Sequence, residues 1–257
     1  MLTFYRICYA AVASVGVAKG MMANMHESDI LLEKDTVLKW ADDRGNDTGA
    51  IKEEAFKSRR DRVLQLVGSE HKVYIDLDPN SSIGTYSTRN CIHLPISFFF
   101  SETYLRTLKD TEISLTITRN RALDFVLKHE LGHLSNNQIS LSSWLNVLKY
   151  PMILLPIFHP YLLFSIPIYE VIDFLACCWA ERDADRQAFE RCSEDELKMA
   201  KQYFWRAGQD EWSEYNKKPW YQKLFYSSMG GHWFFDPHPA PSQRIAKIND
   251  LLNPSYV

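Results

Sequence analysis

The sequence lacks the common patterns of nucleotide and nucleic-acid binding. It contains neither a glycine-rich dinucleotide motif nor a phosphate-binding loop, and no fixed-period repeat or low-complexity tract occurs. The 29 basic and 32 acidic residues leave a net charge of −3, and no basic stripe with interleaved aromatic residues is present. We therefore expect no nucleic-acid partner. The 257 residues, 46% of them hydrophobic, suffice for one large domain or two small ones.

Cysteines are few, and their spacing argues against a cysteine-ligated zinc site, because none forms a Cys-x-x-Cys pair. Free cysteine is often buried, so we expect buried, unpaired thiols. If an N-terminal segment is removed, four cysteines remain and disulfides become the alternative. The five are Cys8, Cys91, Cys177, Cys178 and Cys192.

Charge is missing from a short run near the N-terminus, residues 7–18, which lies between Arg6 and Lys19. Its 12 residues are too few to span a bilayer, which needs about 20. The length fits the core of a signal peptide. We therefore assign residues 1–22 to a signal peptide or N-terminal anchor, with a packed helix as the alternative, and residues 23–257 to the functional domain. The protein is expected to be membrane-associated, or exported after cleavage.

A second hydrophobic run covers residues 150–169 and contains no Asp, Glu, Lys or Arg. Its 20 residues reach the length of a membrane span. Four prolines interrupt it, and proline breaks a helix by removing a donor and clashing with the preceding turn. We expect a hydrophobic hairpin that dips into a membrane, and the alternative is an apolar insertion packed on the protein. The prolines are Pro151, Pro156, Pro160 and Pro167.

The hydrophobic periodicity predicts a mainly α protein with a small β-sheet (α+β). Residues 113–119 are read either as a strand or as the entry into the next helix. The other expected elements are helices within 28–67 with a turn at 41–49, two or three strands within 72–96, a helix over 119–135, helices over 170–192 and 194–208, and a last helix after a proline-rich loop.

Residues 126–135 read VLKHELGHLS and place two histidines four residues apart on an expected helix. Residues at this spacing share one helix face, so His129 and His133 can both reach one metal ion. Glu130 is rotated by about 100° from His129. Its carboxylate can therefore reach a water on the open side of the metal, as a general base does. Leu131 and Gly132 add no competing charge, and two solvated surface histidines are the alternative.

A catalytic zinc site takes three protein ligands and leaves one position for water, so a third ligand is required. Glu181 and Asp185 are also four residues apart on an expected helix. Glu181, on a second helix packed against the first, completes a set of two histidines and one carboxylate. Asp185 is placed to accept a hydrogen bond from a ligand histidine. An ordinary charged helix face, with Arg182 and Arg186 as ion-pair partners, is the alternative.

The stretches HELGH (129–133) and ERDAD (181–185) resemble the His-Glu-x-x-His and Glu-x-x-x-Asp motifs of the zinc metallopeptidase family that contains HtpX and the CAAX prenyl endopeptidases. HPAPSQR (238–244) is similar to the family's late His-Pro followed by an arginine. The resemblance covers roughly residues 60–252. It implies a zincin-like endopeptidase domain with a small sheet beside the site, a substrate-binding edge strand near SIGTYS (82–87), and membrane segments between the two metal motifs.

The residues and the resemblance together predict a zinc metalloendopeptidase. One Zn²⁺ per chain is expected, held by His129, His133 and Glu181, with Glu130 as the general base. The expected partners are a protein or peptide substrate and a membrane. The alternatives are a zinc-stapled interaction module without catalysis and a hydrolase of lipids or small amides.

The late motif supplies two further candidates. His238 is expected to stabilise the oxyanion, and His232 competes with it for this role. Arg244 is expected to hold the C-terminal tail against the helix that carries Glu181 and Asp185. An ordinary loop histidine is the alternative for His238.

Overall fold

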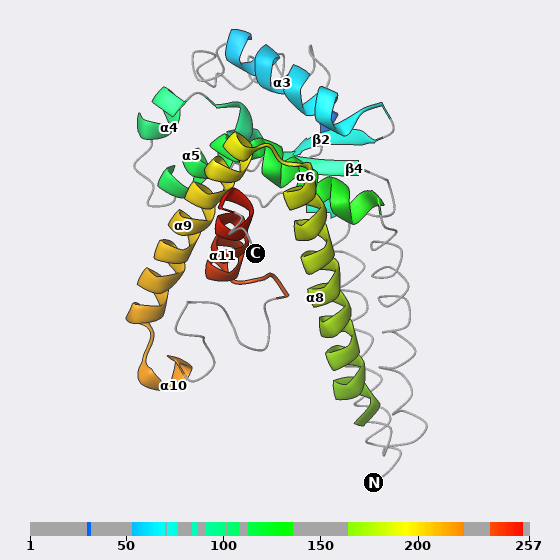
Figure 1. The fold of residues 1–257 in the computed structure, drawn as a ribbon, viewed down its shortest axis with the longest axis vertical. Coiled ribbons are helices and arrows are strands. Elements are labelled where there is room, and N and C mark those ends of the chain that lie inside the picture. The colour runs from blue at the N-terminus through cyan, green and yellow to red at the C-terminus, as the bar shows by residue number, and fades with distance from the viewer. Residues whose placement is uncertain are drawn as a thin grey trace, which may run out of the picture.

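The computed structural model describes residues 30–31, 53–69, 71–76, 84–86, 91–100, 102–107, 113–135, 164–223 and 237–253. Within these ranges the chain is mainly helical with one small sheet, which confirms the predicted class (Figure 1). The helices are α3 (Glu53–Val67), α4 (Glu102–Thr107), α5 (Ile113–Arg121), α6 (Leu123–Ser135), α8 (Ser165–Arg191), α9 (Glu194–Lys217), α10 (Trp220–Lys223) and α11 (Pro241–Leu252), and a 3₁₀ turn, η3, spans Ile96–Phe99.

The sheet has the strand order β1-β2-β4-β3, formed by β1 (Ile30–Leu31), β2 (Lys72–Asp76), β3 (Gly84–Tyr86) and β4 (Cys91–Pro95). The two central strands, β2 and β4, are parallel, and β1 and β3 pair antiparallel at the edges. All five residues of β4 are buried, and Ile92 of β4 and Ile75 of β2 are fully buried. They share a hydrophobic core with Phe56 and Val63 of α3 and Leu127 of α6. The sheet therefore supports one side of α6.

A second core joins α6 to the long helices. The ring of Phe125 lies 5.2 Å from that of Phe189 on α8 and 5.3 Å from that of Phe204 on α9, measured between centroids. Ile248 of α11 is fully buried in the same cluster. Because one core packs on each side of it, α6 is held at the centre of the described fold, between the sheet and the helices (Figure 1).

Local sequence explains where two helices begin. At the start of α9, the Ser193 hydroxyl accepts from the backbone N–H of Glu196, and the Glu196 carboxylate accepts from the backbone N–H of Ser193 at 2.6 Å. This capping box satisfies N–H groups that have no partner inside the helix. Pro241 opens α11, where its missing N–H removes no helical hydrogen bond.

Two predictions of secondary structure were wrong in detail. Residues 30–31 lie in a strand rather than a helix, because Ile30 pairs with Ile75 and Leu31 with Tyr74. The helix expected over 119–135 is two helices, α5 and α6, with Ala122 between them. Residues 113–119, for which the sequence left both a strand and a helix open, are helical. The three strands within 72–96, the helix over 170–192 and the last helix are confirmed.

The proposed signal peptide or anchor, residues 1–22, and residues 150–163 of the expected hairpin lie outside the described residues. The end of the hairpin, Ser165–Tyr169, is the first part of α8. Among the described residues, no helix combines the length and the apolar character that crossing a membrane requires. Cys177 and Cys192 are unpaired, as predicted, but both are partly exposed rather than buried. Partial burial raises the pKa of Cys192 to about 12.

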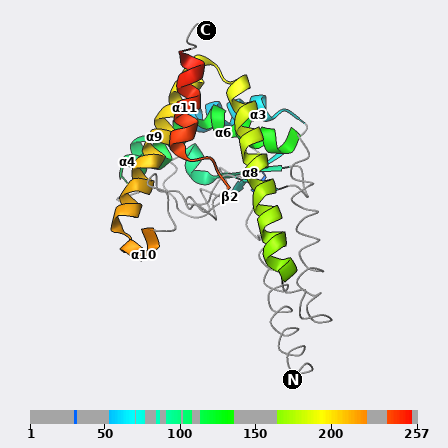
Figure 2. The same cartoon turned by 60° about the horizontal axis from the view of Figure 1, so that its bottom comes forward.

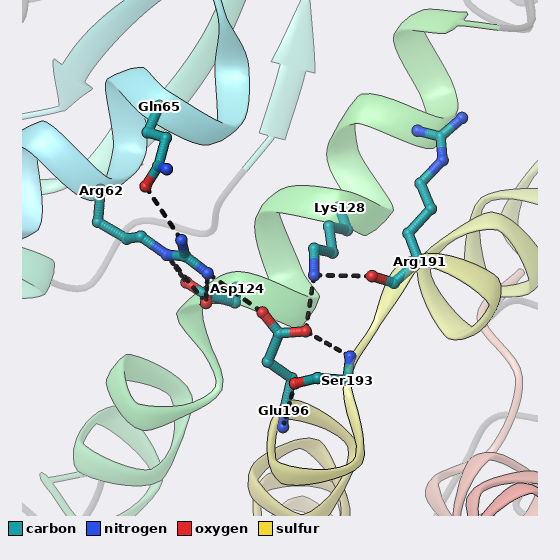
Figure 3. A network of polar contacts seen from close by, with 7 residues as sticks. All are labelled: Arg62, Gln65, Asp124, Lys128, Arg191, Ser193 and Glu196. Atoms are coloured by element: carbon teal, nitrogen blue, oxygen red, sulfur yellow. Dashed lines mark hydrogen bonds and ion pairs between the residues drawn. The ribbon is translucent and has the colours of Figure 1, made fainter.

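Polar contacts connect α6 to the helices on either side of it (Figure 3). Arg62 of α3 donates to Asp124 of α6 at 3.0 Å and to Glu196 of α9 at 3.2 Å. Lys128 of α6 donates to the Glu196 carboxylate at 2.7 Å and to the Arg191 carbonyl at the end of α8 at 2.9 Å. The side chains of Lys128 and Glu196 are only 12% and 15% exposed, so their ion pair is well shielded from solvent.

The change Glu196→Gln tests this network. It leaves the poorly exposed ammonium group of Lys128 without its charged partner, so the free energy of unfolding should fall by about 1–3 kcal/mol. The matched control is Glu194→Gln, because Glu194 pairs with Lys198 at the surface and no measurable loss is expected there. Urea denaturation of both variants measures the effect. Equal losses would contradict a bracing role for Glu196.

Candidate metal centre

The candidate metal centre forms where α6 crosses α8 at backbone contact. A β-carbon placed on Gly132 would lie 2.9 Å from the Cα atom of Ala184 and 3.3 Å from its Cβ atom. Side chains do not approach a backbone that closely, so α8 can occupy this position only because residue 132 is glycine. The crossing brings the histidines of α6 level with Glu181 and Asp185 of α8.

Three side chains converge at the crossing. The Nε2 atoms of His129 and His133 lie 3.2 Å apart. Each Nε2 atom lies 3.3 Å from one of the two oxygens of the Glu181 carboxylate. Two imidazole nitrogens and one carboxylate oxygen, all within 4.8 Å of one another, form a group that could hold a metal ion. The structure thus brings together the three ligands predicted from the sequence.

Asp185 fixes the orientation of His129. The Nδ1 atom of His129 faces Oδ1 of Asp185 at 2.9 Å, and its Nε2 atom faces the other two candidate ligands. The predicted contact between Asp185 and a ligand histidine is therefore present.

Arg244 fastens the C-terminal helix to the same residues. Its Nε atom donates to Oδ2 of Asp185 at 2.6 Å, and its Nη2 atom lies 3.8 Å from Oε2 of Glu181. The guanidinium also lies over the ring of Phe204, 4.9 Å from the centroid. The predicted contact of Arg244 with the helix of Glu181 and Asp185 is confirmed. This cation sits beside two carboxylates that would otherwise repel each other.

Opposite charges shift the protonation of the cluster. Burial alone lowers the pKa of His129, but its hydrogen bonds to Asp185 and Glu181 outweigh burial and raise it to about 9. Burial alone raises the pKa of Glu181, but its hydrogen bonds with His129 and His133 outweigh burial and hold it well below the usual range. In the metal-free cluster, a proton on His129 therefore supplies positive charge to the two carboxylates.

Glu130 lies beside the cluster without belonging to it. It is 8% exposed and is not part of the group of possible ligands. Its negative charge contributes to the raised pKa of His129, the residue that precedes it in α6. Among the described residues, none forms a hydrogen bond or an ion pair with the side chain of Glu130. Its carboxylate is therefore available for proton transfer.

His238 borders the cluster on its exposed side. Its Nε2 atom lies 3.4 Å from Oε2 of Glu181, and its side chain is 53% exposed. The loop before α11 thus brings this histidine to the predicted place, although its expected role in catalysis stays a prediction. His232, the competing candidate, lies outside the described residues.

Sequence reasoning missed the role of Gly132 and Ala184. Gly132 was read only as a small residue that adds no charge, whereas its contact with Ala184 sets the distance between the two helices. A glycine inside a helix costs about 1 kcal/mol relative to alanine. Its presence within HELGH was therefore a sign that another backbone comes close.

Comparison of the chain with protein-family models, curated proteins and solved structures finds no match. The resemblance to zinc metallopeptidases is therefore carried by three short motifs. All three meet at the crossing of α6 and α8. There Oε2 of Glu181 lies 3.3 Å from Nε2 of His129 and 3.4 Å from Nε2 of His238.

The change Gly132→Ala should push α6 and α8 apart. We expect a loss of about 1–3 kcal/mol in the free energy of unfolding and weaker metal binding, because the ligands come from both helices. Gly208→Ala on α9 is the control. Its β-carbon would meet Pro241 at 3.4 Å, an ordinary contact, so that variant should gain up to about 1 kcal/mol. Equal effects of the two substitutions in urea denaturation would contradict the close-contact account.

Metal uptake should release a proton, because histidine binds a metal only when that nitrogen is unprotonated and His129 titrates at about 9 in the metal-free chain. From about pH 7 toward that pKa, the affinity for Zn²⁺ should rise about tenfold per pH unit, and it should level off above it. The free energy of unfolding of the metal-free protein should follow the opposite trend. The contribution of the His129 proton is complete below pH 6.5 and is lost as pH rises through about 9. Competition with a chromophoric chelator measures the affinity, and a flat profile would contradict this assignment.

Proposed function

We propose that the protein is a zinc-dependent endopeptidase of the metallopeptidase family that its motifs resemble. The observation that carries this proposal is the position of Glu130, which is buried beside the three possible ligands but is not one of them. A metal that only staples a fold needs no such carboxylate, whereas hydrolysis needs a base beside the attacking water.

The ligand set and its spacing support zinc as the metal. Two imidazoles and one carboxylate are a common catalytic zinc set, whereas Mg²⁺ and Ca²⁺ prefer oxygen ligands alone. Tetrahedral ligands at about 2.0 Å from a metal lie about 3.3 Å apart. The Nε2 atoms of His129 and His133 are 3.2 Å apart, which fits this spacing. A bound zinc ion would lower the pKa of a water molecule toward about 7 and would polarise a substrate carbonyl.

Each neighbouring side chain then has a defined task. Glu130 accepts a proton from the attacking water and delivers it to the leaving amine. Asp185 keeps the proton of His129 on Nδ1, so that the lone pair of Nε2 stays directed at the site. Arg244 offsets the charge of Asp185 and Glu181. His238, on the exposed side, donates a hydrogen bond to the oxygen that becomes negative as water attacks.

The sheet supports a peptide as the substrate rather than a lipid or a small amide. β3 is an edge of the described sheet and contacts α6, the helix that carries Glu130. An extended peptide can pair with such an edge through its backbone, which presents its carbonyl groups at regular intervals. The resemblance implies a substrate-binding edge strand near residues 82–87, the part of the chain that contains β3.

The change Glu130→Gln should retain zinc and fold normally but lower peptide hydrolysis by about 10²–10⁴-fold, because the amide cannot accept the proton. Glu181→Gln should lose zinc as well as activity, because it removes a ligand. Glu190→Gln, on the exposed side of α8, serves as the neutral control. Cleavage of casein or an unstructured peptide is measured with zinc content on the same samples. If Glu130→Gln cleaves as fast as the wild type, the alternative function replaces this proposal, namely a zinc-stapled interaction module without catalysis.

The change His238→Ala should keep zinc and lower kcat by about 10²–10³-fold with little change in KM, because the lost hydrogen bond forms mainly in the transition state. His238→Gln retains a donor and should recover part of kcat. The comparison of kcat and KM for the three proteins measures this. Unchanged kcat in His238→Ala would assign the exposed histidine no part in catalysis.

A further inference from the structure

The last turn of α6 carries one of the three candidate ligands. α6 ends at Ser135, so His133 lies in its final turn. The carbonyl groups of a final turn lack partners inside the helix, and such turns fray. His129 lies one turn earlier and is oriented by Asp185. A contact that holds the final turn against α8 therefore bears directly on the position of His133.

Gln187 of α8 makes such a contact. Its side-chain Oε1 atom accepts a hydrogen bond from the hydroxyl of Ser135 at 2.8 Å. The same hydroxyl lies 3.1 Å from the carbonyl oxygen of Gly132, one of the carbonyls that the end of the helix leaves without a helical partner. Ser135 thus joins the end of α6 both to its own backbone and to α8.

The side chain of Gln187 is itself fixed on α8. The residue is 7% exposed. Its Nε2 atom donates to Oδ2 of Asp183 at 3.1 Å, and Arg191 donates to its Oε1 atom at 3.2 Å. A carboxylate only accepts hydrogen bonds and a guanidinium only donates them, so these two neighbours settle which end of the amide is which. The amide oxygen is therefore presented to Ser135 in one orientation.

The hydrogen bond between Ser135 and Gln187 lies across the backbone contact from the candidate ligands. On α6, a rotation of about 100° per residue places the two histidines on one side of Gly132 and Ser135 on the other. On α8, the same rotation places the carboxylates of the site on one side of Ala184 and Gln187 on the other. Figure 2 shows α6 beside the C-terminal half of α8, which contains both the backbone contact and Gln187. The contact sets the separation of the helices, and the hydrogen bond limits their twist about it.

We propose that Gln187 is a positioning residue of the candidate metal centre. Through Ser135 it holds the final turn of α6, and this keeps His133 directed at the metal. Gln187 itself touches neither the metal nor the substrate. The inference rests on the proposed function, because it presupposes the zinc site, but its test measures metal binding rather than hydrolysis. Residues that orient metal ligands typically change metal affinity by about 10–100-fold when they are replaced.

Zinc affinity of the full chain, measured by competition with a chromophoric chelator, tests this role. Gln187→Leu removes the amide at about the same volume and should weaken zinc binding by about tenfold or more. Ser135→Ala should also weaken it, and this variant should fold because Ser135 is exposed. The double variant should bind zinc about as well as Gln187→Leu alone, because both changes remove the same hydrogen bond. Ser135→Thr keeps a hydroxyl and should bind zinc as the wild type does.

Val63→Ala separates positioning from stability. Val63 of α3 is 1% exposed, so its truncation should lower the thermal stability of the protein but leave zinc affinity unchanged. The visible spectrum of bound Co²⁺ depends on the geometry of the ligands, and it should change in Gln187→Leu but not in Val63→Ala.

Wild-type zinc affinity in Gln187→Leu and Ser135→Ala would overturn the proposal. An equal loss of affinity in Val63→Ala, or additive losses in the double variant, would overturn it as well. A wild type that binds zinc without cleaving peptides, together with weaker zinc binding in Gln187→Leu, would contradict the proposed enzyme and support the positioning role.

Discussion

Backbone contact between Gly132 of α6 and Ala184 of α8 is the constraint on which the candidate metal centre depends. The space between the two helices has no room for a β-carbon at position 132. Since His133 follows Gly132 and Asp185 follows Ala184, the contact sets the separation of the side chains that meet around it. Two hydrophobic cores and the ion pair of Lys128 hold α6 in this position from the other sides.

Alternating charge makes the buried cluster stable. Arg244 faces Asp185, Asp185 faces His129, and His129 faces Glu181, so each charge contacts one of opposite sign. Buried charges of one sign are costly unless they are paired, which explains why the chain brings an arginine from α11 to this site. Loss of the proton from His129 would leave its Nε2 atom directed at the place where a cation would sit, with Glu181 beside it. The residues that pair in the metal-free cluster are thus also candidate metal ligands.

The sequence allowed prediction of those features that depend on spacing within one helix. His129 and His133, and likewise Glu181 and Asp185, are four residues apart, and helical geometry alone places each pair on one face. Contacts between distant segments were harder. Residues 30–31 look helical locally but pair with β2, and the break at Ala122 has no proline or glycine to mark it.

The zinc content of the purified full-length chain tests the central claim that His129, His133 and Glu181 bind one metal ion. Elemental analysis should find about one zinc per chain in the wild type. In His133→Ala most of the zinc should be absent, because two remaining ligands bind a metal weakly. Equal zinc in the two proteins, or no zinc in the wild type after loading, would contradict the account.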